Sequence, residues 1–180
     1  MNTLKHIRAI LLLPVMVTLI IPGVILHTTG TANIGRAGPP PLDFMLPLLG
    51  VLLIGFGLTL VVKTNVLFIK IGKGTLAPWD ATQKLVVHGP YRYVRNPMIS
   101  GVFCILLGEA AMLGSGPLFC WFLFFLALNL VYTPLFEERD LERRLGEEYR
   151  VYKKHVPRWI PHLRPWEKPS DKGNNLTYRS

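Results

Sequence analysis

Two short polar segments of this chain carry residue types that could hold a small charged molecule at a membrane surface. The first, residues 88–97, reads HGPYRYVRNP and combines two arginines, two tyrosines and a Gly-Pro turn. The second is the adjacent carboxylate pair Glu137 and Glu138, which follows a long apolar run. Basic, aromatic and acidic groups together could bind a polar cofactor beside a lipid-soluble substrate. They meet only if the apolar residues between them form a hairpin.

Both segments also have a purely structural interpretation. Asn caps helices well and Pro is favoured at the first helical position, so Asn96 and Pro97 predict a helix start. Arg92 and Arg95 could anchor the loop to lipid head groups, with the tyrosines as an interfacial belt. The acidic pair after residue 136 could complement the dipole of a following helix. Spacing alone leaves these alternatives open.

A further carboxylate, Glu109, stands inside an apolar run, where an ionisable residue is a functional candidate by default. A catalytic role and an ion pair with Lys63, at a similar depth, are both compatible with the sequence. Cys104 and Cys120 lie inside apolar runs. We therefore expect neither a disulfide nor a metal site.

The elements that must position these residues are predicted by hydropathy. Half of the 180 residues are hydrophobic and only 17% are charged, against about 25% in soluble domains. Apolar blocks at about 8–28, 44–69, 98–113 and 118–136 predict an all-α integral membrane helical bundle with about four transmembrane helices. Glycines in the second block predict close helix packing, and a GSGP turn makes the last two blocks a hairpin. These glycines are Gly50, Gly55 and Gly57.

Lys and Arg, which outnumber Asp and Glu by 20 to 11, gather before the first block, in the 70–97 loop and after residue 136. This distribution places both termini in the cytoplasm and favours membrane lipid over nucleic acid as a partner. A cleaved signal peptide is a weaker alternative, because no small-x-small site follows the first block.

The region after the fourth block changes character. Apolar residues recur at helical spacing and predict one amphipathic cytoplasmic helix over about 137–155. Residues 167–180 are polar, and we expect them to be disordered. The apolar positions of the predicted helix are Leu141, Leu145, Tyr149 and Tyr152.

These segments resemble the isoprenylcysteine carboxyl methyltransferase family, to which phospholipid methyltransferases are more distantly related. Residues 88–98 are similar to its G-x-Y-x-x-x-R-H-P-x-Y signature, and residues 137–161 to its second signature. The resemblance implies one domain over 1–166, with a cofactor region at 74–99 and 133–161. It also implies an S-adenosylmethionine-dependent membrane methyltransferase of bacterial type, in the inner membrane, acting on a lipophilic or lipid-linked acceptor.

Roles for particular residues follow from the sequence and from the resemblance together. Arg95, Glu138 and Glu109 are the catalytic candidates, and either carboxylate could serve as a base if the acceptor is an amine or a hydroxyl. Thr133 is expected to face the substrate, because it stands where the prenylcysteine enzymes have an arginine for the substrate carboxylate. The prenylcysteine substrate is therefore not expected here. Cofactor contacts would fall on Gln83, Lys84, Leu85, Val86, Tyr91, Asn96, Pro97, Met98, Ile99 and Glu137.

Three positions depart from the family pattern. Asn96 replaces the usual His, as it often does in bacterial relatives, Ile99 replaces the usual Tyr, and Thr133 replaces the arginine of the prenylcysteine enzymes. The changes at Ile99 and Thr133 leave open whether the substrate is altered or activity is lost. An NADPH-dependent membrane reductase of similar architecture is one alternative, and a lipid-binding protein without catalytic activity is another. The sequence leaves open whether methyl transfer would be to oxygen, nitrogen or sulfur, and what the oligomeric state is.

Overall fold

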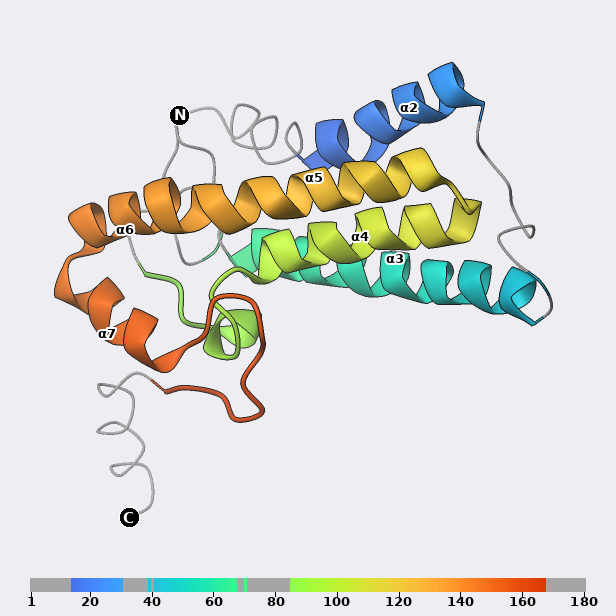
Figure 1. Ribbon diagram of the computed structural model, residues 1–180. Coiled ribbons are helices and arrows are strands. Elements are labelled where there is room, and N and C mark those ends of the chain that lie inside the picture. The colour runs from blue at the N-terminus through green and yellow to red at the C-terminus, as the bar shows by residue number, and fades with distance from the viewer. Residues whose placement is uncertain (1–13, 31–38, 40, 68–69, 71–84, 168–180) are drawn as a thin grey trace, which may run out of the picture.

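The computed structural model describes residues 14–30, 39, 41–67, 70 and 85–167 (Figure 1). Every regular element in these ranges is helical. The predicted cofactor contacts Gln83 and Lys84, and the tail from 168 onward, lie outside the described residues. The elements in order are η1 (Met16–Ile20), α2 (Ile21–Thr29), α3 (Leu42–Leu67), η4 (Gly89–Arg92), α4 (Pro97–Leu113), α5 (Gly116–Tyr132), η5 (Thr133–Glu137), α6 (Glu138–Leu145) and α7 (Glu147–His155).

Two helices are long and apolar enough to cross a membrane: Leu42–Leu67, and the continuous helix Gly116–Leu145 formed by α5, η5 and α6. Met16–Thr29 and Pro97–Leu113 are shorter apolar helices. Many large apolar side chains point outward, including those of Phe44, Leu52 and Phe124. This arrangement is consistent with a membrane helical bundle, while the four predicted spans stay a prediction.

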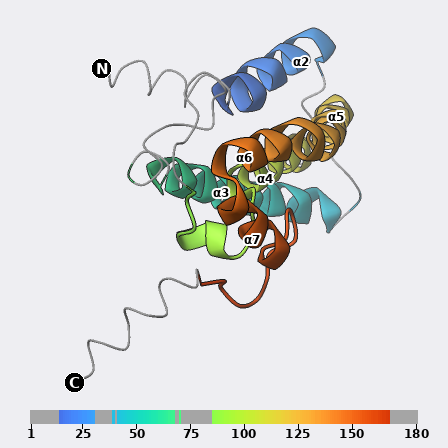
Figure 2. The same ribbon diagram turned by 90° about the vertical axis from the view of Figure 1, so that its left-hand side faces the viewer.

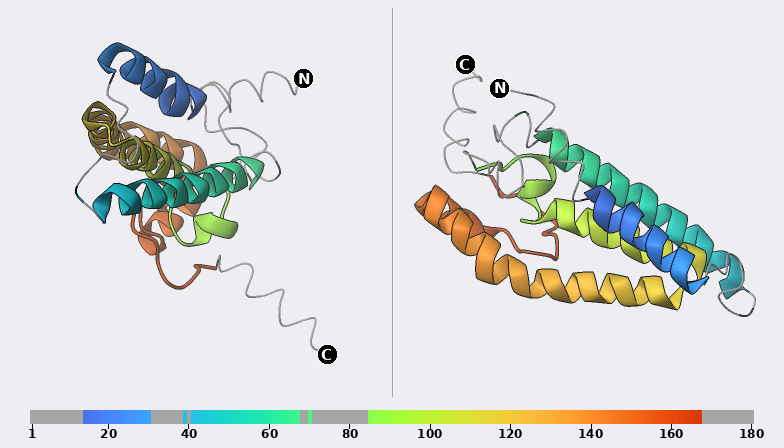
Figure 3. Two further views of the ribbon diagram at one scale, coloured as in Figure 1. Left: turned by 90° about the vertical axis from the view of Figure 1, so that its right-hand side faces the viewer. Right: turned by 90° about the horizontal axis from the view of Figure 1, so that it is seen from above.

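The α3 and α4 helices run antiparallel and lie side by side (Figure 3). Their closest approaches occur at two glycine pairs, Gly50 with Gly108 and Gly57 with Gly101. A Cβ atom added to Gly57 would lie 2.5 Å from the Gly101 carbonyl oxygen, and one added to Gly50 would lie 2.6 Å from that of Gly108. Nothing lies within 4 Å of a Cβ on Gly55. Two of the three glycines predicted for close packing therefore face α4, and one does not.

The α4–α5 hairpin turns at Gly114, which has a φ of 56°, a value that favours glycine. α5 then continues into η5, a π-helical turn that contains Pro134. Proline has no N–H to donate, and a π turn adds a residue to the helical repeat. The direction of the side chains that follow is therefore reset just before Glu137 and Glu138.

The predicted single amphipathic helix over 137–155 is wrong in one respect, because the chain breaks at Gly146. This residue has φ 59° and ψ −135°, a region open almost only to glycine. The break folds α7 back, away from the axis of α6 (Figure 2). As a result α7 packs over residues 85–91 and does not continue the long helix.

Candidate functional site

The first predicted segment forms a compact loop where α4 begins. Residues 85–87 have no regular structure, and η4 turns the chain at Gly89–Arg92. Asn96 occupies the N-cap position of α4, although its side chain makes no capping hydrogen bond. Val86 and Tyr91 are buried together, with Leu67 of α3 packed against them. Tyr93, two residues on, is exposed. The loop therefore turns one tyrosine toward the bundle and the other outward.

Helix α7 covers this loop with its tyrosines. The Tyr152 hydroxyl donates a 2.7 Å hydrogen bond to the Tyr91 carbonyl oxygen. Val87, Tyr149, Tyr152 and Val156 form a buried cluster. Because the two segments are 61 residues apart in sequence, only the tertiary fold brings them into contact.

Residues 156–167, here called the strap, run back along the loop. The Arg95 amide donates to the Pro157 carbonyl at 2.9 Å, and the His162 amide donates to the Tyr93 carbonyl at 2.9 Å. The Trp166 amide completes the series by donating to the Arg92 carbonyl at 2.9 Å. The loop (85–96), α6, α7 and the strap together are called the polar cap.

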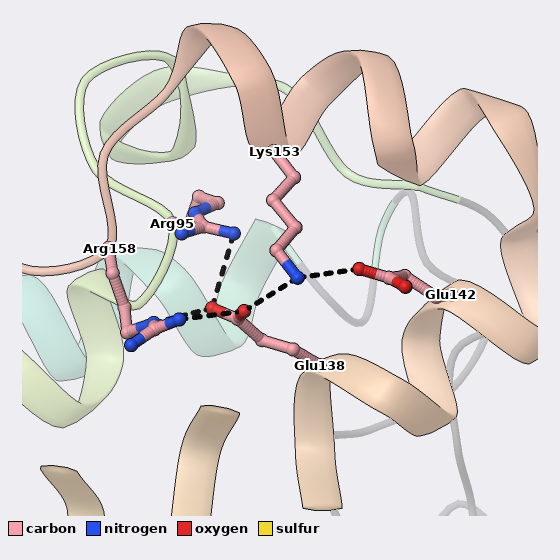
Figure 4. A network of polar contacts seen from close by, with 5 residues as sticks. All are labelled: Arg95, Glu138, Glu142, Lys153 and Arg158. Carbon is pink, nitrogen blue, oxygen red and sulfur yellow. Dashed lines mark hydrogen bonds and ion pairs between the residues drawn. The ribbon is translucent and has the colours of Figure 1, made fainter. Parts of the chain in front are cut away.

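Glu138 lies at the centre of the polar cap and forms ion pairs with three cations (Figure 4). Arg158 binds it in a bidentate manner, Nε to Oε1 at 2.6 Å and Nη2 to Oε2 at 2.9 Å. Arg95 Nη1 lies 3.1 Å from Oε1, and Lys153 Nζ lies 3.2 Å from Oε2. The side chains of Glu138 and Arg95 are only 2% and 8% exposed. The cluster thus joins α6, α7, the loop and the strap.

Glu137 occupies a different environment from its neighbour. It is half-buried, and its carboxylate lies close to Thr133, one turn earlier, whose Oγ1 atom has no hydrogen-bond partner among the described residues. Thr133 is fully buried in η5, and the Tyr91 side chain is close enough for the Glu137 charge to act on it. A hydroxyl from η5, the Glu137 carboxylate and the Tyr91 phenol therefore lie near one another beside the Glu138 cluster.

The phenols of the polar cap are held in their neutral form. Burial raises the pKa of Tyr91 well above its ordinary value, and the nearby Tyr152 and Glu137 raise it further. Burial likewise raises the pKa of Tyr149 and that of Tyr152. The pKa of Lys153 is also raised, first by its hydrogen bond to Glu142. At neutral pH these tyrosines act as hydrogen-bonding and packing groups, and Lys153 is charged.

The remaining predicted site residues fall into two groups. Leu85 packs against the α7 cluster, and Pro97, Met98 and Ile99 form the first turn of α4, beside the loop. Glu109 does not join them, because it lies 12 residues along α4 from Pro97, about 18 Å at the rise of an α-helix.

The ion pair of Glu109 with Lys63, one of the two alternatives that the sequence left open, does not form. The antiparallel register places Gly108 opposite Gly50, so Lys63 lies about 20 Å away along α3. Lys63 is exposed. The sequence argument had assumed a similar depth without knowing this register.

Four residues that the sequence argument did not select prove central to the fold or to the cap. Lys153 and Arg158 complete the Glu138 cluster, and Gly101 and Gly108 complete the α3–α4 contact. The seven-residue separation of Gly101 and Gly108, matching that of Gly50 and Gly57, was a detectable signal. Nothing in the local pattern distinguished Arg158 from the other basic residues of the tail.

Comparison with known proteins places the chain in a family. The profile of the phospholipid methyltransferase family matches residues 45–148. The chain belongs to this family. The family consists of membrane methyltransferases and includes the isoprenylcysteine carboxyl methyltransferases. No curated protein and no solved structure matches the chain. The predicted membrane methyltransferase class is therefore confirmed, and a finer subfamily is not.

Proposed function

We propose that this protein transfers a methyl group from S-adenosylmethionine to a lipophilic or lipid-linked acceptor at the cytoplasmic face of a membrane, with both termini on that face. The observation that carries the proposal is the joining of the two signature segments: Arg95 of the first contacts Glu138 of the second at 3.1 Å. Tyr91, Glu137 and Thr133 lie near one another beside this contact.

The residues on that side suit such a cofactor. Val86 and Tyr91 offer an apolar wall for an adenine ring. The Glu137 carboxylate can accept hydrogen bonds from an amino group or from ribose hydroxyls, and it complements positive charge. The Asn96 Nδ2 atom is buried with no hydrogen-bond partner among the described residues, so it is available to a ligand. When bound, S-adenosylmethionine supplies an electrophilic methyl group on a sulfonium.

The chain's own contribution is mainly alignment and exclusion of water. The strap and α7 close over the loop through the Arg95–Pro157 and Tyr152–Tyr91 hydrogen bonds. Glu138 already forms ion pairs with three cations, so it is poorly suited to accept a proton from the substrate. We therefore assign Glu138 and Arg95 the role of positioning neighbouring residues. Glu109 is too far along α4 for proton transfer. An acceptor that is already anionic would need no base.

Calorimetry in detergent tests the proposal. We expect wild-type protein to bind S-adenosylmethionine and Glu137→Gln to weaken binding at least about tenfold, since hydrogen bonds to a charged group are worth about 1.5–3 kcal/mol. Glu147→Gln is the matched control, because Glu147 is exposed and pairs only locally with Arg150 at 2.9 Å. Absence of binding by the wild type, together with NADPH oxidation by the same preparation, would instead support the reductase alternative.

A further inference from the structure

The strap is fastened to the rest of the polar cap near both of its ends. At one end, the Pro157 carbonyl oxygen accepts from the Arg95 amide. At the other end, Arg92 makes two contacts: its carbonyl oxygen accepts from the Trp166 amide at 2.9 Å, and its Nε donates to the Trp166 carbonyl oxygen at 3.1 Å. The Trp166 ring also stacks on His155 of α7. The residues between these attachments are therefore held in place as a loop.

The middle of this loop presents large apolar side chains to the outside of the protein. Ile160 is 80% exposed and Leu163 is 99% exposed, more than any other large apolar residue that the structure describes. The His162 amide, between them, donates to the Tyr93 carbonyl oxygen at 2.9 Å. Because the backbone is fixed on both sides of Leu163, this side chain cannot be buried by a simple collapse of the loop. Such exposure of apolar surface is unfavourable in water.

The register of α3 and α4 gives the depth that the strap reaches. Gly101 lies opposite Gly57, which stands ten residues, or about 15 Å, before the end of α3 at Leu67. Phe103 lies two residues further into α4, and the Trp159 ring lies 5.4 Å from the Phe103 ring. In Figure 1 the strap, drawn in red, accordingly loops back to the level where α4 begins. Because α3 is long and apolar enough to cross a membrane, the Trp159 ring lies at a level that lipid chains would occupy.

The composition of the strap suits a loop that enters a lipid leaflet. Every backbone N–H group in lipid needs a hydrogen-bond partner, and three strap residues are prolines, which have no such group: Pro157, Pro161 and Pro165. The charged residues between positions 157 and 166 are both arginines, Arg158 and Arg164. Arg164 is exposed, one residue after Leu163. A basic group beside an inserted apolar side chain favours a membrane surface that carries anionic lipid.

We propose that the strap is a re-entrant membrane anchor. Ile160 and Leu163 insert among the acyl chains of the leaflet on the side of the polar cap, and Arg164 stays among the lipid head groups. The partner is the bilayer itself and not a bound substrate, so the proposal does not depend on methyl transfer. Because the strap is hydrogen-bonded to residues 92, 93 and 95, the inserted loop would hold the polar cap against the membrane surface.

Spin labels test the surroundings of the loop directly. The two cysteines of the described residues, Cys104 and Cys120, are replaced by Ala, and one label is attached through Leu163→Cys in nanodiscs of phosphatidylcholine and phosphatidylglycerol. Oxygen collides more often with a label in lipid, and a water-soluble nickel chelate more often with a label in water. Two exposed positions provide the references: Leu52→Cys on the outward face of α3 for lipid, and Lys154→Cys on α7 for water.

We expect the label at position 163 to behave like the lipid reference and unlike the water reference, and a label at position 160 to do the same. A label at 163 that responds like the one at 154 overturns the proposal. Broadening of the signal by a label of a second molecule also overturns it, because another copy of this chain would then cover the loop.

The anchoring is tested by the rate at which trypsin cleaves after Arg158 in the same nanodiscs. Leu163→Glu places a charge among the acyl chains and should speed cleavage about tenfold or more, as for loss of the burial of one leucine side chain. Leu163→Met, the matched control, stays apolar and should leave the rate unchanged. Since Leu163 is almost fully exposed, lost packing within the protein cannot cause the effect.

Equal cleavage rates for Leu163→Glu and the wild type would overturn the proposal. Binding of S-adenosylmethionine by the wild type, measured separately, decides the proposed function.

Discussion

In the α3–α4 pair the closest approaches are between backbone atoms at glycines, whereas in the polar cap they are between charged side chains. The pair brings the Gly57 and Gly101 backbones so close that a methyl group would not fit. The cap buries a carboxylate among three cations. In lipid, apolar surface gives helices little reason to associate, so packing and close approach must hold them. In the cap, charge partners set the position of segments that have little regular structure.

The largest effect is expected from filling the glycine contact. Gly57→Leu should force α3 and α4 apart, because a Cβ at this position lies 2.5 Å from a backbone oxygen that cannot rotate away. We expect a loss of about 3 kcal/mol or more, above the usual range for overpacking. Thermal unfolding in detergent measures this.

Gly55→Leu is the matched control for this change, since nothing lies within 4 Å of its Cβ. It should change stability by no more than about 0.5 kcal/mol. Equal destabilisation by the two substitutions would mean that glycine matters here for some other reason than helix contact.

The next largest loss of stability is expected from a substitution in the cluster around Glu138. Glu138→Gln removes the charge that three cations share, and breaking a buried pair costs about 3–5 kcal/mol. Because Arg158 and Lys153 are 28% and 37% exposed, water can solvate them in part, so we expect about 2–3 kcal/mol. The strap should loosen as well, which limited proteolysis near residue 158 would detect.

The exposed i,i+4 pair of Asp140 with Arg144, at 2.8 Å, provides the comparison within the same helix. Asp140→Asn should cost no more than about 0.5 kcal/mol. If Glu138→Gln reduced stability as little as Asp140→Asn does, the ion pairs of Glu138 would not be what holds the segments of the polar cap together.

A smaller effect is expected from the hydrogen bond between α7 and the loop. Tyr152→Phe removes the donor to the buried Tyr91 carbonyl oxygen and should cost about 1–2 kcal/mol. Tyr132→Phe, at an exposed position, should cost almost nothing. A thermal scan of both variants makes the comparison, and a larger loss at Tyr132 would contradict it.

The smallest predicted effect is a pH dependence confined to the cap. The folded-state pKa values of Tyr149, Tyr152 and Lys153 are all raised, the tyrosines by burial and the lysine by Glu142. A raised folded pKa stabilises the fold fully below the unfolded pKa and stops doing so as pH rises through the folded value. The unfolded values lie near 10, so stability should fall from about pH 10 upward.

Melting temperatures between pH 8 and 11.5 follow this loss. The melting temperature of Tyr152→Phe should fall less steeply at alkaline pH than that of the wild type, because this variant lacks one of the three titrating groups. A fall in melting temperature that is already complete below pH 9 would mean that other groups cause it.

Much of the helical content was predictable, because long apolar runs with Gly and Pro at their ends carry an unambiguous signal. Asn96 and Pro97 predicted the start of α4, which is confirmed. The break at Gly146 was not predicted, because the apolar spacing of Leu145 and Tyr149 continues through it. Hydrophobic periodicity does not report a single residue with positive φ, and a glycine there was compatible with an unbroken helix.

Sequence alone determined the family, the two signature segments, and the residues from which a site can be built. These properties are local, since they depend on residue type and on spacing along the chain. The tertiary structure decided which residues of the site touch. It separated Glu138, held by three cations, from Glu137 beside Thr133 and Tyr91, although the two carboxylates are adjacent in sequence. It also placed Glu109 far from both. Neighbouring side chains on a helix point about 100° apart, so only the packing of α7 and the strap determines what each one meets.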